Sequence, residues 1–219
     1  MEKSIFNREH FFGVTQISAS SYNLIIGLTL CWGFLLNWLT VVSIPVESLQ
    51  GINPWVFFIG YFLCCMSGSF ILARSDKPLF SFIGYNMIVV PFGLVLNLIV
   101  SHYSSSLVQE AMRVTGEITF VMMLLGSMYP AFFLGIGRAL FFALLTAIVV
   151  QIIEVFVFHK THPVMDWIIA IIFSGYIGYD WARANAIPKT LDNAIDSAAA
   201  LYLDIINLFI KVLQILNNK

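Results

Sequence analysis

The chain has 219 residues, of which 59% are hydrophobic and only 11% are charged, and its mean hydropathy is +0.89. Soluble domains carry about 25% charged residues, so this composition excludes a soluble globular protein and indicates an integral membrane protein. The formal net charge is -1 and no basic cluster stands out, which argues against a nucleic-acid partner. The three cysteines lie in apolar runs and predict neither a disulfide framework nor a metal site.

Residues 1–21 are polar and of mixed charge, without an apolar core followed by a small-residue cleavage site. We therefore predict a cytoplasmic N-terminal segment over residues 1–21 that is not a cleaved signal peptide. The remainder, residues 22–219, is predicted to form a single transmembrane domain.

Apolar stretches of about 20 residues, the length that a helix needs to cross a bilayer, follow one another along this domain. Seven such spans are predicted, over residues 22–44, 54–73, 79–100, 118–136, 139–158, 164–182 and 191–216. The polar residues 101–117 are expected to form a surface helix or cap. Gly137 and Arg138 are expected to form a short turn, which would make the fourth and fifth spans an antiparallel hairpin.

The basic residues predict the orientation, because cytoplasmic loops of membrane proteins carry an excess of Lys and Arg. The side that includes the N-terminus holds Lys3, Arg8, Arg74, Lys77, Arg138, Arg183 and Lys189. The other side holds Arg113, Lys160 and Lys219. We predict a multi-pass protein of a bacterial plasma membrane, with its N-terminus in the cytoplasm and its C-terminus outside.

The last span carries a polar stripe. Steps of three or four residues, which share one helix face, join Asp196, Ala200, Asp204, Asn207 and Lys211. Asp196 has a plainer interpretation as an acid at the start of the helix, and Lys211 either extends to the interface or pairs with an acid. Asp204 lies too deep for either interpretation, and an ionisable group at such a depth usually has a function.

A second deep acid, Asp180, lies near the cytoplasmic end of the sixth span. Asp204 lies on the order of 10 Å from the same side, so consecutive antiparallel helices would bring the two carboxyl groups together. Two acids in a site of low dielectric do not both ionise easily, and such a pair acts either as a proton-controlled latch or as an ion site. Arg74 and Arg183 are the two candidate partners for Asp180.

Glu154, in the fifth span, lies close to two histidines in the sequence. It is interpreted either as a second station of an ion path or as an interfacial acid satisfied by its neighbours. A zinc site formed by His102, His159 and His162 is a weaker alternative.

Two motifs in the last third carry a resemblance. Residues 200–209 read Ala-Leu-Tyr-Leu-Asp-Ile-Ile-Asn-Leu-Phe, and Gly178-Tyr179-Asp180 precede them; together they resemble the signature of the transmembrane Bax-inhibitor-motif family. Residues 98–103 also resemble bacterial members. The resemblance implies an all-α fold in which six helices surround the C-terminal one. It also implies a pH-sensitive calcium leak in which Asp180 and Asp204 are the sensor and Arg74 latches onto the first acid.

The favoured function is therefore a calcium leak channel or cation exchanger, not an enzyme, that is gated by protonation. Its gate would be Asp180, Asp204 and Arg74, its ion pathway would include Asp196, Asn207, Glu154 and Lys211, and calcium would bind at Asp180 and Asp204. The expected partners are the lipid bilayer, calcium and protons.

Two other classes of protein remain open. An intramembrane aspartyl protease also places an aspartate on each of two consecutive helices, but Leu201-Tyr202-Leu203 stand where such enzymes have Gly-x-Gly. The other class is a non-conducting regulatory protein that binds other membrane proteins in the bilayer.

Overall fold

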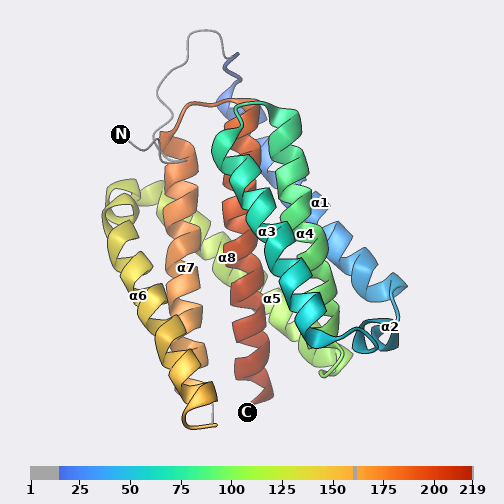
Figure 1. Ribbon diagram of the computed structural model, residues 1–219. Coiled ribbons are helices and arrows are strands. Elements are labelled where there is room, and N and C mark those ends of the chain that lie inside the picture. Colours follow the sequence, from blue (N-terminus) through green and yellow to red (C-terminus); the bar gives the residue numbers. More distant parts are fainter. Residues whose placement is uncertain (1–14, 160–161, 219) are drawn as a thin grey trace. The chain divides into compact units, whose positions relative to one another are not determined.

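The computed structural model describes residues 15–159 and 162–218, and the regular elements within these ranges are all α-helices (Figure 1). Six of them are long and apolar enough to cross a membrane: α1 (Ala19–Ser43), α3 (Pro54–Arg74), α4 (Pro78–Val100), α5 (Ser105–Met128), α6 (Pro130–Phe156) and α8 (Leu191–Asn217). The protein is therefore an all-α, multi-pass membrane protein, as its composition predicts. Residues 1–14 of the predicted N-terminal segment lie outside the described residues.

The predicted count of seven spans is not confirmed, because α7 (Pro163–Ala186) is not among the six. This helix matches the others in length, but its second half is poor in aliphatic residues. Between Ser174 and Trp181, only Ile177 is aliphatic. The remaining helix, α2 (Val46–Gln50), is a short element between α1 and α3.

Local side-chain chemistry sets several helix starts. The hydroxyl of Ser18 accepts a hydrogen bond from the Ser21 amide at 3.1 Å, and Ser104 accepts one from the Leu107 amide at 3.3 Å. These N-caps satisfy amides that have no partner inside the helix. α3, α4 and α6 each begin with a proline, which loses nothing in the first turn because its missing N–H would be unpaired there.

The main correction to the predicted spans lies between residues 101 and 158. The prediction of a turn at Gly137 and Arg138 was wrong, since both residues lie inside α6. The predicted surface segment belongs to α5, and the break falls at Tyr129, with φ -126° and ψ 53°. A proline disfavours helical backbone in the preceding residue, so Pro130 stops α5, whereas a glycine within a helix costs only about 1 kcal/mol.

The chain divides into two compact units. Of the described residues, the first unit comprises 15–102 and 187–199, and the second comprises 103–159, 162–186 and 200–218. α8 therefore contributes its beginning to the first unit and its remainder to the second. An arrangement of six helices around α8 would join the two units, and it stays a prediction.

In the first unit, α4 packs against both α1 and α3. A Cβ atom added at Gly68 would lie 2.6 Å from the carbonyl oxygen of Gly84, so the backbones of α3 and α4 are in direct contact. The hydroxyl of Tyr85 donates to the carbonyl of Thr29 at 2.9 Å and holds α4 on α1. Small residues at such crossings permit close packing in a membrane.

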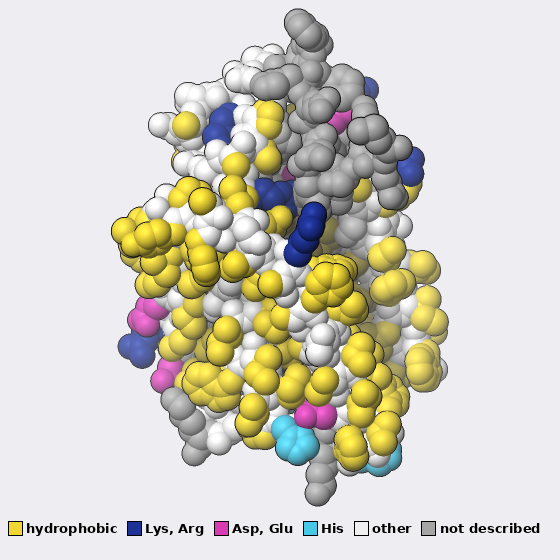
Figure 2. Space-filling view, turned by 90° about the vertical axis from the view of Figure 1, so that its left-hand side faces the viewer, with side chains coloured by type: hydrophobic (Ala, Val, Ile, Leu, Met, Phe, Trp, Pro, Cys, Tyr) yellow, Lys and Arg dark blue, Asp and Glu magenta, His cyan; other side chains and the backbone are white. Residues whose placement is uncertain are grey.

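In the second unit, α7 packs against both α5 and α6. The outward face of α6 carries exposed hydrophobic side chains, among them Phe132, Phe141, Phe142, Leu145 and Ile152. Figure 2 shows the face of the protein that includes α6, and hydrophobic side chains cover much of it. This surface is suited to contact with lipid tails rather than with water.

Candidate functional site

The second unit brings the two predicted acids together. Asp180 lies on α7 and Asp204 on α8, and the two carboxyl groups are within hydrogen-bonding reach of each other. Asp204 is 7% exposed, and its Oδ2 atom has no hydrogen-bond donor among the described residues. Two ionised carboxylates offer only acceptors, so a hydrogen bond between them requires that one of them hold a proton. The geometry therefore suits a shared proton.

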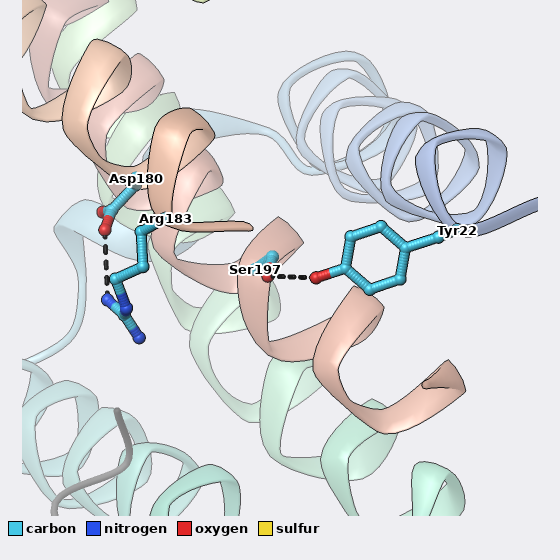
Figure 3. A network of polar contacts seen from close by, with 4 residues as sticks. All are labelled: Tyr22, Asp180, Arg183 and Ser197. Atoms are coloured by element: carbon cyan, nitrogen blue, oxygen red, sulfur yellow. Dashed lines mark hydrogen bonds and ion pairs between the residues drawn. The ribbon is translucent and has the colours of Figure 1, made fainter. Parts of the chain in front are cut away.

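Arg183 compensates one of the two acids. Its Nη1 atom lies 3.2 Å from Oδ1 of Asp180, one turn earlier on the same helix (Figure 3). The two side chains are 16% and 11% exposed, so the ion pair is largely shielded from water. Of the two arginines that the sequence offers, Arg183 is the one that pairs with Asp180 within this unit.

Arg74 lies in the first unit, at the end of α3. Its guanidinium carbon is 4.8 Å from the centre of the Phe70 ring, a cation–π contact within α3. A latch between Arg74 and Asp180 would join the two units, and that role stays a prediction.

Tyr176 is a member of the site that the sequence analysis missed. It lies one helical turn before Asp180 and interacts electrostatically with both Asp180 and Asp204. The sequence feature that could have identified Tyr176 is its four-residue spacing from Asp180, which places both side chains on one face of α7. The adjacent Tyr179, quoted in the family motif, instead packs against Gly137 of α6.

The polar residues of the α8 stripe are divided between the two units and have different partners. Asn207 donates its amide to the carbonyl of Leu203 in the same helix at 2.7 Å, and Asp196 belongs to the first unit. Lys211 pairs with Asp166 of α7, with 2.9 Å between Nζ and Oδ1. The alternative in which Lys211 binds an acid is thus confirmed, and its charge is neutralised within the helix packing.

Glu154 also has a local partner. Its Oε1 atom lies 2.9 Å from Nδ1 of His162, and the carboxylate is mostly buried while the imidazole is exposed. This contact agrees with the interpretation of Glu154 as an acid satisfied by its neighbours. No group of three metal-ligating side chains occurs in the described part of the chain, so the zinc site with His102 and His159 gains no support.

The start of α8 carries a second set of buried polar contacts, in the first unit. Asp192 accepts a hydrogen bond from the Ser81 hydroxyl at 2.5 Å, and the hydroxyls of Tyr22 and Ser197 are 2.9 Å apart (Figure 3). In the loop just before α8, burial lowers the pKa of Lys189, whose ammonium lies 4.7 Å from the centre of the Tyr22 ring. Asp192, an acid in the first turn of α8, therefore also anchors this helix to α4.

Together these observations define a class: a multi-pass helical membrane protein with a carboxyl pair buried in its helix packing. The family model described as "Inhibitor of apoptosis-promoting Bax1" matches residues 14–219. The chain belongs to this Bax-inhibitor family, which is the family that its motifs resemble.

Individual relatives agree with this assignment. An uncharacterized protein of Helicobacter pylori is 28% identical over 170 residues, which cover 74% of this chain and 70% of the relative. An uncharacterized membrane protein of Streptococcus pyogenes is 29% identical over 133 residues, or 56% of this chain and 57% of the relative. The protein named Bax inhibitor 1 of Schizosaccharomyces pombe is 25% identical over 169 residues, or 75% of this chain and 62% of the relative.

Proposed function

We propose that this protein is a pH-sensitive leak pathway for calcium that is gated by the carboxyl pair of Asp180 and Asp204. The observation that carries the proposal is the position of Asp204. It is buried beside a second acid, and one of its oxygens has no donor among the described residues. A buried acid without compensation is costly, and its presence in a membrane-spanning helix argues for a function.

The net charge of the site depends on whether the carboxyl pair holds a proton. Asp180, Asp204 and Arg183 together carry no net charge when the two acids share one proton, and one negative charge when that proton leaves. The charged state is unfavourable at low dielectric unless a cation approaches or the helices separate. Calcium, a hard cation that prefers oxygen ligands, is suited to this state and is the transported ion in the proposal.

Other polar side chains complete the pathway in the proposal. Asp196 and Asn207 would contribute oxygens along α8, Glu154 and Lys211 would lie nearer the opposite end, and Arg74 would hold Asp180 in the closed state. The contact of Lys211 with Asp166 supports this assignment, because a neutralised lysine does not repel a passing cation. No catalytic step is assigned to any residue.

The test is calcium flux into liposomes that contain the purified protein and a calcium indicator. Flux through the parent protein should change with pH. Asp204→Asn should remove this dependence, because an amide does not gain or lose a proton in this pH range. Glu110→Gln is the matched control, since it neutralises an exposed acid of α5 and should leave the pH profile unchanged.

A pH profile like the parent's in Asp204→Asn would rule out the gating mechanism. Absence of flux at every pH, together with a membrane protein that co-purifies, would support the non-conducting regulator instead. Cleavage of a membrane substrate that is lost in Asp180→Ala would support the protease.

A further inference from the structure

The residues on either side of Asp180 are held by the joint between α5 and α6. We use the term α5–α6 joint for residues 126–137, in which Tyr129 alone separates the two helices. Three of the four residues from Gly178 to Trp181 contact this joint. Asp180, the fourth, instead contacts Arg183 and Asp204.

The first contact is between helix backbones. A Cβ atom added at Gly126 would lie 2.6 Å from the carbonyl oxygen of Gly178, so α5 and α7 touch without intervening side chains. On the other side of the joint, a Cβ atom added at Gly178 would overlap the ring of Phe133. Phe133 is itself buried, so neither neighbour of Gly178 has room to move aside.

The second and third contacts flank Asp180 directly. The ring of Tyr179 covers Gly137, where an added Cβ atom would lie 2.6 Å from Cε2 of the ring. Trp181 donates its indole N–H to the hydroxyl of Ser127 at 2.7 Å. The backbone of α7 is therefore held both before and after Asp180 by groups that belong to the α5–α6 joint.

We propose that the α5–α6 joint positions the carboxyl group of Asp180 against that of Asp204, and that Gly126 and Ser127 are positioning residues of the pair. The inference rests on the proposed function of the carboxyl pair, and it adds the element that determines its geometry. At low dielectric the interaction between two carboxyl groups depends strongly on their separation. A displacement of α7 at Gly178 therefore changes how tightly the pair holds its shared proton.

The test compares two alanine substitutions on the same helix. Gly126→Ala places a methyl group against the Gly178 carbonyl and forces α5 and α7 apart, whereas Gly116→Ala is the control, because its Cβ atom meets nothing within 4 Å. The readouts are the pH midpoint of calcium flux and the pH midpoint of the carboxyl infrared band. Gly126→Ala should move both midpoints to lower pH by at least about 0.5 unit, a threefold change in proton affinity.

Ser127→Ala keeps the backbone contact and removes the hydrogen bond to Trp181, so it provides a second test if Gly126→Ala does not fold. Trp181→Phe removes the same hydrogen bond from the other side and should shift the midpoint in the same direction. Midpoints equal to the parent's in all the variants that fold would overturn the inference. A shifted infrared midpoint in a protein that conducts no calcium would support the positioning role and contradict the proposed function.

Discussion

At the scale of the residue, the charged side chains within the helix packing of the second unit have local partners. Asp180 pairs with Arg183, Lys211 with Asp166, and Glu154 with His162. Such pairing is expected, because an isolated charge removed from water costs several kcal/mol. Asp204 differs from these residues, since the side chain beside it is a second acid.

The pair of Lys211 and Asp166 gives a prediction about stability. The two side chains are 14% and 15% exposed, so Lys211→Met should destabilise the protein by about 3 kcal/mol, because it leaves the carboxylate of Asp166 buried and unpaired. The double variant Lys211→Met with Asp166→Asn should recover much of this loss. Thermal unfolding in detergent measures both effects. Equal destabilisation by the single and the double variant would show that the charge of Asp166 is not the cause.

At the scale of the element, close helix crossings depend on a few glycines, and a proline determines where one helix ends. α3 crosses α4 at Gly68 and Gly84, and α5 crosses α7 at Gly126 and Gly178. At each crossing a backbone carbonyl occupies the space that a side chain would need. Without a hydrophobic force between helices in lipid, such close packing is a main source of their association.

A comparison within α3 tests the first crossing. Gly68→Ala should destabilise the protein by about 2 kcal/mol, because its methyl group would lie 2.6 Å from a backbone oxygen that cannot yield without moving α4. Gly60→Ala meets nothing within 4 Å and should stabilise the helix by about 0.5 kcal/mol. The thermal unfolding midpoints of the two variants, measured in the same detergent, test this difference in stability. Similar midpoints for both would contradict the assigned crossing.

At the scale of the whole molecule, α8 is the element that the two units share. Its first part is anchored in one unit by hydrogen bonds to Ser81 and Tyr22, and its remainder carries Asp204 and Lys211 in the other. α8 is also the most buried of the six candidate spans: 56% of the residues in its apolar stretch are buried, compared with 6% in α6. A helix so covered by protein is one that tolerates acids at membrane depth.

The number of spans determines the side on which each end of α8 lies. With the N-terminus in the cytoplasm, as the basic residues predict, a reporter fused after Pro188 should lie in the cytoplasm and one fused at the C-terminus should lie outside if α7 crosses the membrane. If α7 does not cross, both positions are reversed. Fusions to alkaline phosphatase, which is active outside, and to green fluorescent protein, which fluoresces inside, measure this directly. We expect the seven-span pattern. Phosphatase activity in the fusion after Pro188, without activity in the C-terminal fusion, would contradict it.

The class of the protein, most helix positions and the two acids could be predicted from the sequence. These features depend on composition or on local sequence. The mean hydropathy indicates that lipid surrounds the chain, and helical spacing shows that Asp204 lies too far along α8 to be a helix cap. The predicted helix limits were accurate where a proline or a polar cap marks them, as in α3 and α8. They failed around Tyr129, because α5 ends there, just before Pro130, and α6 continues through Gly137, where a turn was predicted.

Which partner each charged side chain has depends on how the helices pack and could not be predicted from the sequence. The choice of Arg183 for Asp180, of Asp166 for Lys211 and the approach of Tyr176 to both acids depend on how helices are rotated and displaced against each other. Those variables depend on contacts between residues far apart in the chain, such as Gly126 with Gly178, which helical periodicity does not encode. Asp180 and Asp204 can therefore be identified from the sequence. The geometry that would let them share a proton arises from helix packing.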